Sequence, residues 1–145
     1  MLVSVWRIML SLWVSSVLVV ISLPWSKFDG TPHWENVQLI PFAYFNLHPA
    51  VLIETLLNIL AFVPVGYLAV RSVPRSSQGG VILALAVGVS SSVGIELYQL
   101  FCQQRVASIS DVLMNVGGTA IGSWLAFAID QILCSFAVEP RRSTT

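Results

Sequence analysis

Residues 91–122 read SSVGIELYQLFCQQRVASISDVLMNVGGTAIG, and this stretch decides the fold. It divides into the end of one apolar helix (91–101), a polar loop (102–110) and the start of a second apolar helix (111–122). Charged and amide side chains are concentrated here: Glu96, Gln99, Arg105, Asp111 and Asn115. Such groups are costly near hydrocarbon, so in a membrane protein they indicate a functional site.

The composition is typical of an integral membrane protein. Of the 145 residues, 56% are hydrophobic and only 10% are charged, whereas soluble domains have about one quarter charged. Four spans of about 20 residues and their loops account for the length, which predicts a single membrane domain over residues 1–145. The formal net charge is zero, so the chain has no basic field for nucleic acid.

Apolar segments at about 3–23, 51–70, 81–101 and 112–131 predict an all-α, polytopic bundle of four transmembrane helices. The first segment resembles a signal peptide in its early positive charge, Arg7. Its length, and the lack of a small-residue cleavage site before Pro24, favour an uncleaved span. Pro64 predicts a bend in the second span, and residues 71–80 (RSVPRSSQGG) predict a loop.

The first loop, about residues 25–50, is the longest connection. Its apolar segments 39–42 (LIPF) and 44–45 (YF) predict a position in the headgroup zone, with Trp25 as an interfacial anchor. His33, Glu35 and His48 are conceivable metal ligands, but the histidines are far apart in a loop, and we predict no metal or other cofactor.

Lys and Arg predict the orientation. Five lie on one side of the predicted bundle (Arg7, Arg71, Arg75, Arg141 and Arg142) and two on the other (Lys27 and Arg105). Both termini are therefore expected in the cytoplasm, and the long first loop outside it. The two cysteines suggest neither a disulfide framework nor a zinc site. They are expected to serve as topology probes, with Cys102 reactive from outside and Cys134 protected.

Small and polar residues form a stripe on each of the last two spans. The stripes are Gly88, Ser92, Glu96, Gln99 and Gln103 on the third span, and Asp111, Asn115, Gly118 and Gly122 on the fourth. We expect the stripes to face each other, and the spacing Gly118-x-x-x-Gly122 to permit close helix packing. Glu54 and Asn58 share one face of the second span. The polar groups should form one layer within about 10 Å of the extracytoplasmic helix ends.

Four blocks of sequence resemble the VanZ-like family of small bacterial membrane proteins. They are LIPF (39–42), NILAFVPVG (58–66), IELYQ (95–99) and Arg105 followed by DVLMNVGG (111–118), within a match of about residues 38–122. The family often has Asn where this chain has Gln38. The resemblance implies a multi-pass protein of the bacterial plasma membrane. It also implies a role at the cell envelope, because the founding member is associated with resistance to the glycopeptide teicoplanin.

The polar residues could form an enzyme's site, and whether the protein is an enzyme stays open. A desolvated carboxyl group could act as acid or base, and a second carboxylate, kept ionised by Arg105, could do the opposite. No Ser-His-Asp order, P-loop or HExxH motif narrows the reaction. The candidate acid–base residues are Glu96, Asp111 and Glu54. The candidate binding residues are Arg105, Asn58, Gln99, Asn115 and Gln38.

Structural roles compete with these functional ones. Asp111 could cap a helix, with Ser108 or Ser110 beside it, and the amides could link helices by hydrogen bonds. Arg105 could pair with Glu96 or Asp111 simply to neutralise them. Of these residues, Glu96 is the one for which a functional role is most strongly favoured over a structural one. Helix caps and interhelical hydrogen bonds rarely need a carboxylate one to two turns inside a span.

Three classes of function remain. The favoured one is an outward-facing site that binds or modifies an envelope precursor, a lipid headgroup or a glycopeptide-related ligand. An ion-coupled transporter would need polar groups through the whole bilayer, and the cytoplasmic halves offer little beyond Thr119 and Ser123. A non-catalytic assembly or stability factor would tolerate carboxylate substitutions but not changes at Gly118 and Gly122.

Overall fold

The computed structural model describes residues 2–23, 27–43, 48–74 and 77–138. Its helices are α1 (Leu2–Ser22), the 3₁₀ helix η2 (Trp34–Asn36), α2 (Pro49–Arg71), α3 (Ser77–Leu100) and α4 (Ile109–Val138). The four α-helices are long and apolar enough to cross a membrane, which confirms the predicted four-helix membrane bundle. Several residues used in the predictions lie outside the described residues: Pro24, Trp25, Tyr44, Phe45, Arg75, Arg141 and Arg142.

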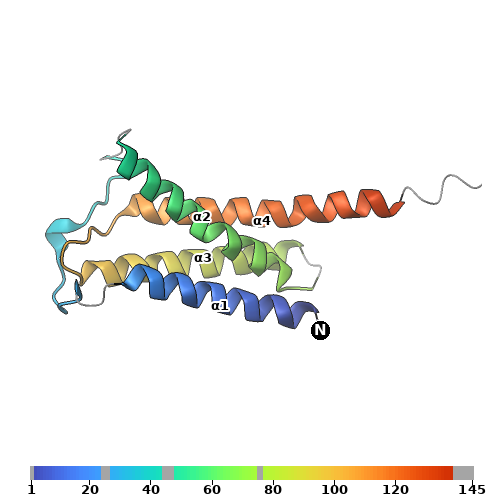
Figure 1. The fold of residues 1–145 in the computed structure, drawn as a ribbon, viewed down its shortest axis with the longest axis horizontal. Helices are drawn as coiled ribbons and strands as arrows, with labels where there is room; N and C mark the ends of the chain where they lie inside the picture. The colour runs from blue at the N-terminus through green and yellow to red at the C-terminus, as the bar shows by residue number, and fades with distance from the viewer. Residues whose placement is uncertain (1, 24–26, 44–47, 75–76, 139–145) are drawn as a thin grey trace, which may run out of the picture.

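Helix α2 runs obliquely across the bundle and packs against α1, α3 and α4 (Figure 1). Glycines on both partners let α2 and α4 approach to backbone contact. A Cβ atom at Gly118 or Gly122 would collide with the carbonyl oxygens of Ile59 and Val63, and one at Gly66 would collide with the backbone at Thr119. The predicted close packing is confirmed, but the Gly118 and Gly122 part of the stripe faces α2 and not α3.

The rest of the two stripes does bring α3 and α4 together. A Cβ at Gly88 would lie 2.5 Å from Thr119 Oγ1. One turn further along, Asn115 Nδ2 donates to Ser92 Oγ at 2.9 Å. These contacts confirm that the polar faces of α3 and α4 pack against each other.

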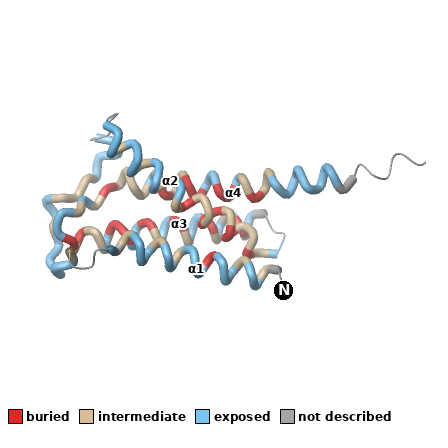
Figure 2. Tube along the Cα trace, viewed as in Figure 1, coloured by how far each residue is buried: buried red, intermediate tan, exposed pale blue. Residues whose placement is uncertain are grey.

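The apolar core lies where α2 meets the other helices, around Phe62, Val65 and Ala69 (Figure 2). Large apolar side chains on the outer helix faces are exposed, as a lipid-facing surface requires. The exposed surface includes the last turns of α4, which extend past the other helices. The fourth span was predicted to end near residue 131. It continues to Val138 because residues 132–138 contain neither Gly nor Pro.

The end of the bundle that holds the α1 N-terminus is fixed by arginines. Arg7 Nε donates to the Ser72 carbonyl at 3.1 Å. Arg71 pairs with Asp130 at 2.5 Å and stacks on the Tyr67 ring at 5.4 Å. The predicted loop over residues 71–80 is too long, because α3 begins at Ser77. Gly80 packs closely against α2: a Cβ atom added there would lie 3.1 Å from Val70 Cα.

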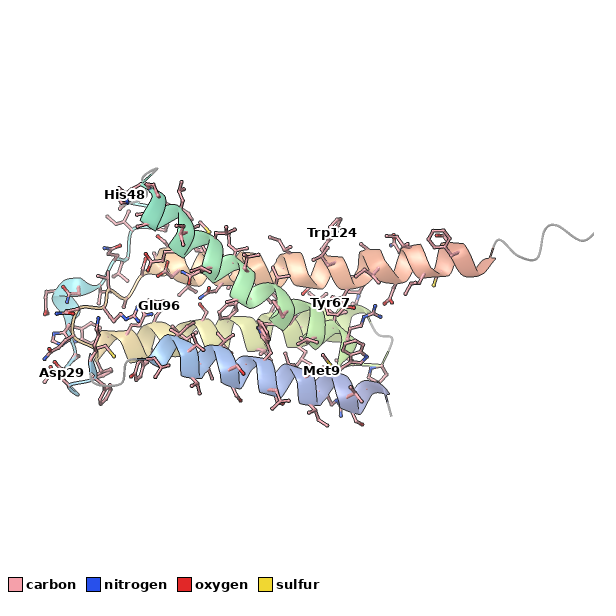
Figure 3. All side chains as sticks on the ribbon, in the orientation of Figure 1. Met9, Asp29, His48, Tyr67, Glu96 and Trp124 are labelled. Atoms are coloured by element: carbon pink, nitrogen blue, oxygen red, sulfur yellow. The ribbon has the colours of Figure 1, made fainter. Side chains whose placement is uncertain are left out.

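The opposite end, which we call the loop end, is formed by residues 27–43 and 101–108. These two loops pair through isolated bridges between Phe28 and Cys102 and between Gln38 and Ser108. His33 N donates to the Leu100 carbonyl at 2.8 Å, next to the first of these bridges. The long first loop therefore lies over the same helix ends as the candidate site residues, as predicted. In Figure 3, Asp29 and His48 lie at the end of the molecule nearer to Glu96, and Met9 and Tyr67 lie at the other.

Candidate functional site

The start of α4 is fixed by a serine cap. Ser108 Oγ accepts the Ser110 N–H at 3.2 Å, the arrangement of an N-cap residue with the second residue of its helix. Ser110 Oγ in turn accepts the Phe42 N–H at 2.8 Å and so connects the first loop to α4. Ser108 is therefore the N-cap residue of α4, and Asp111 is not needed as a helix cap. Asp111 lies in the first turn of α4, where the helix dipole favours a negative charge.

Glu96 is held in a structural contact. It is 9% exposed, and its Oε2 accepts the Ser108 N–H at 2.6 Å. The bond joins the end of α3 to the residue that caps α4. A sequence does not reveal such a bond, because Ser108 is twelve positions away and the acceptor is a side chain.

Three helices each bring a carboxylate and, four residues deeper along the same face, an uncharged polar group. The pairs are Glu54 and Asn58 on α2, Glu96 and Ser92 on α3, and Asp111 and Asn115 on α4. We call Glu54, Glu96 and Asp111 the carboxylate layer, and Asn58, Ser92 and Asn115 the second polar layer. The three carboxylates are close enough to interact electrostatically. Asn58 and Asp111 line the same cavity.

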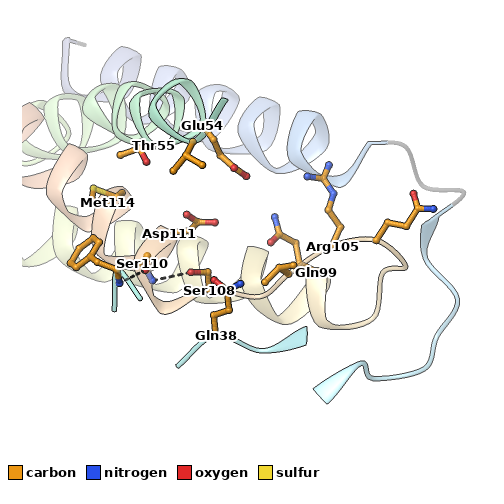
Figure 4. A pocket seen from close by; sticks show the side chains of 13 residues that line it. Gln38, Glu54, Thr55, Gln99, Arg105, Ser108, Ser110, Asp111 and Met114 are labelled. Carbon is orange, nitrogen blue, oxygen red and sulfur yellow. Dashed lines mark hydrogen bonds between the residues drawn. The ribbon is translucent and has the colours of Figure 1, made fainter. Parts of the chain in front are cut away.

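Two cavities that share lining residues occupy the space between these layers and the loops. One, of about 310 Å³, is lined by residues that include Gln38, Gln99, Arg105 and Asp111 (Figure 4). The other, of about 600 Å³, reaches Asn58, Glu96 and Asn115. We call them together the polar chamber. All eight predicted site residues line it: Gln38, Glu54, Asn58, Glu96, Gln99, Arg105, Asp111 and Asn115.

Arg105 does not neutralise a carboxylate. Its Nη2 donates to the Leu23 carbonyl at 3.2 Å, at the end of α1, and among the described residues no Asp or Glu oxygen lies within ion-pair distance of the guanidinium. The predicted alternative, pairing with Glu96 or Asp111, is therefore wrong. In Figure 4, Arg105 reaches the chamber from the loop, while Glu54 and Asp111 enter from α2 and α4.

An apolar groove opens from the chamber along α1 and α2. It has a volume of about 180 Å³ and is lined by Trp13, Ser16, Val17, Val20, Ile21 and Ala61. Val20, Ile21 and Ala61 also line the larger chamber cavity, so the two spaces adjoin. Trp13 Nε1 donates to the Ala61 carbonyl at 2.9 Å, which fixes the far part of the groove.

The histidines have other partners. His33 Nε2 lies 2.9 Å from Asp29 Oδ2, and His48 Nδ1 accepts the Ala50 N–H at the start of α2. Within the part of the chain that the structure describes, no group of three His, Cys, Asp or Glu residues is placed to hold a metal ion. The sequence did not predict the link between His33 and Asp29: residues 29–33 are not helical, so their spacing of four residues gave no signal for it.

The sequence matches the VanZ/LLP1 family over residues 6–131, which is most of the chain. The chain belongs to the VanZ/LLP1 family. The match extends the resemblance seen over residues 38–122 to include α1, and therefore the apolar groove of this VanZ/LLP1 protein. No curated protein and no solved structure gives a significant match.

The family's sequence blocks surround the chamber. Asn58 opens the NILAFVPVG block, Glu96 and Gln99 lie in IELYQ, and Asp111 and Asn115 lie in DVLMNVGG. In the LIPF block, Leu39 and Ile40 are exposed, while Phe42 lines the smaller cavity. The backbone of Gln38 pairs with the loop before α4, through N–H donation to the Ala107 carbonyl at 2.8 Å.

Proposed function

We propose that this VanZ/LLP1 protein binds an amphiphilic molecule of the cell envelope, a lipid or a lipid-linked precursor, from the extracytoplasmic leaflet. The single observation that carries the proposal is that the polar chamber adjoins the apolar groove. A molecule with a polar head and an acyl chain would match both spaces at once. Soluble ions or sugars would use only the chamber.

The proposed orientation follows from the charges. Arg7 and Arg71 are at the end away from the chamber, as the positive-inside rule requires of a cytoplasmic end. The exposed apolar residues of the first loop, Trp34, Leu39 and Ile40, suit a segment that lies in the headgroup zone. The chamber would then open at the level of the outer headgroups of the bacterial plasma membrane.

The proposed function is binding, and a carboxyl group of the chamber could in addition act as an acid or base on the bound molecule. Glu54 and Asp111 are the better candidates for direct contact with a ligand, because Glu96 Oε2 already accepts a backbone N–H. Envelope precursors are also the class of molecule on which glycopeptide antibiotics act. A role in teicoplanin resistance would follow if the bound molecule is such a precursor.

The alternatives have less support. Beyond the second polar layer the hydroxyls are bonded to their own helix: Thr119 Oγ1 donates to the Asn115 carbonyl, and Ser123 Oγ to that of Thr119. Phe62 and Thr119 are fully buried at this level, which disfavours a transport path. Substitutions at Gly118 and Gly122 would not identify an assembly factor. Both glycines pack against α2 inside the molecule, so changing them would disturb the fold itself.

The test is ligand-induced stabilisation of the purified, delipidated full-length protein. A total lipid extract of bacterial membranes should raise the thermal unfolding midpoint by several degrees, of the order expected for a site near saturation. Glu54→Gln should reduce the rise, and Glu35→Gln, at an exposed glutamate of the first loop, should not. A rise of equal size in both variants would refute the proposal.

A further inference from the structure

Asn115 carries a polar atom without a partner at the bottom of the chamber. The residue is 2% exposed, and its Nδ2 is committed to Ser92 Oγ. Its Oδ1 is buried and accepts no hydrogen bond from any described residue. A buried carbonyl without a donor costs about 1–3 kcal/mol, and native proteins rarely leave one. The carbonyl therefore indicates an occupant that donates a hydrogen bond.

The surroundings of this atom are rich in acceptors. Asp111 is one helical turn above Asn115, and Glu54 lines the same cavity from α2. Ionised carboxylates only accept hydrogen bonds. The occupant at this depth should therefore carry several N–H or O–H donors. Among the described residues that line the chamber, three carry a carboxyl group and Arg105 alone carries a guanidinium, so the lining favours a cationic donor over a neutral hydroxyl group.

Arg105 supplies the opposite charge at a different place. Its bond to the Leu23 carbonyl holds the guanidinium above the end of α1, and it has no carboxylate partner among the described residues. Val20 and Ile21, which line the apolar groove, lie just below this position on α1. An acyl chain in the groove would thus bring its phosphate to Arg105, a side chain well suited to bind phosphate.

We propose that the chamber is selective for a zwitterionic phospholipid with a primary amine. Its phosphate would bind Arg105, its ammonium group would reach Asp111, Glu54 and Asn115 Oδ1, and one acyl chain would occupy the α1–α2 groove. A primary ammonium has three N–H donors, and a quaternary ammonium has none. This inference rests on the proposed function and specifies the headgroup.

The experiment compares four probes on the purified, delipidated full-length protein in detergent. They are dioctanoyl phosphatidylethanolamine, dioctanoyl phosphatidylcholine, dioctanoyl phosphatidylglycerol and soluble phosphoethanolamine, with affinities measured by native mass spectrometry. The ethanolamine lipid should bind at least about tenfold more tightly than either other lipid. Phosphoethanolamine, which has the headgroup but no chain, should bind more weakly than the ethanolamine lipid.

Variants separate the two charged subsites. Asp111→Asn should reduce binding of the ethanolamine lipid about tenfold and leave that of phosphatidylglycerol unchanged. Arg105→Gln should weaken all three lipids to a similar degree, because each carries a phosphate. Lys27→Gln and Glu35→Gln, which change charges elsewhere on the loop end, are the matched controls. Glu54→Gln provides the same carboxylate test if Asp111→Asn does not fold.

The outcomes distinguish this inference from the proposed function. Equal binding of the ethanolamine and choline lipids, or a preference that survives both carboxylate substitutions, would overturn the headgroup assignment but leave lipid binding intact. Equal binding of phosphoethanolamine would show that the ligand is a soluble phosphoamine. If no lipid binds the wild-type protein, both proposals fail.

Discussion

At the scale of single residues, the charges at the loop end serve two different purposes. Glu96 is buried and fixed to a backbone N–H, so it stabilises the junction between α3 and α4. Among the described residues, Arg105 is bonded only to the carbonyl of Leu23, and it also lines the chamber. Glu96 and Arg105 are therefore close in the sequence and opposite in charge without forming an ion pair.

This separation predicts the result of a double-mutant experiment. Glu96→Gln retains a carbonyl acceptor for the Ser108 N–H and should change the free energy of unfolding by less than about 1 kcal/mol, whereas Glu96→Ala should cost about 1–3 kcal/mol. Because Glu96 and Arg105 are not partners, the effects of Glu96→Gln and Arg105→Ala should add within about 0.5 kcal/mol. Chemical denaturation in detergent measures both. Recovery of stability in the double variant would contradict the assigned contacts.

At the scale of helices and loops, the sequence pattern indicated which faces are polar but not which helix each face meets. The i, i+4 spacing of the polar residues correctly predicted contact between α3 and α4, which the bond from Asn115 to Ser92 makes. Gly118 belongs to the same stripe yet packs against α2. A stripe on one helix is wide enough to touch two neighbours, and the crossing of α2 decides the outcome.

Adjacent glycines on α4 provide a matched test of this packing. Gly118→Ala would drive a methyl group into the Ile59 carbonyl and should destabilise the fold by about 2 kcal/mol or more. Gly117 has nothing within 4 Å of an added Cβ. Gly117→Ala should therefore change the free energy of unfolding by at most about 1 kcal/mol, in the stabilising direction that helix propensity favours. Equal destabilisation by both substitutions, in thermal unfolding of the purified protein, would refute the α2–α4 contact.

The first loop contains a pH-dependent contact outside the membrane spans. The Thr31 backbone N–H, with Gln103 and His33, holds the pKa of Asp29 below its usual range, and the hydrogen bond that the His33 ring donates to the Asp29 carboxylate raises the pKa of His33. Glu35 also faces the His33 ring, at 3.3 Å. The ion pairs lie beside the backbone bonds that join residues 29 and 33 to the end of α3.

The sign of these shifts sets the pH range in which the loop is held. The His33 contribution is complete below the ordinary value of 6.5 and is lost as the pH rises through the raised pKa. The Asp29 contribution is complete above 3.8 and is lost as the pH falls through the lowered pKa. Hydrogen exchange of residues 27–43, corrected for intrinsic rates, should thus show stronger protection at pH 5.5 than at pH 9. His33→Gln should abolish the difference, and an unchanged difference would exclude His33 as its cause.

At the scale of the whole molecule, composition and periodicity were enough to predict four spans and the layer of polar groups. The spacing of charges along helices placed Glu54, Glu96 and Asp111 at one level, and all eight predicted residues line one chamber. The apolar groove could not be predicted, because it depends on how α1 is placed against α2. The contact between Glu96 and Ser108 depends in the same way on the path of a loop.

Orientation in the membrane is the last property on which the functional proposals depend, and the cysteine prediction needs revision. Cys102 is 3% exposed and donates to the Tyr98 carbonyl, so the expectation that it reacts from outside does not fit its burial. Glu35 and Pro74 are exposed at opposite ends of the bundle. Glu35→Cys and Pro74→Cys, each combined with Cys134→Ser, are better probes.

A membrane-impermeant thiol reagent should label Glu35→Cys in intact cells and Pro74→Cys only after the membrane is opened. The reason is that the positive-inside rule assigns the end with Arg7 and Arg71 to the cytoplasm. The Cys134→Ser protein, which keeps buried Cys102, gives the background. The reverse pattern would place the chamber at the cytoplasmic leaflet. The chamber could then still bind a phospholipid, but a cell-wall precursor on the outer surface could no longer reach it, so labelling separates the lipid proposal from the role in glycopeptide resistance.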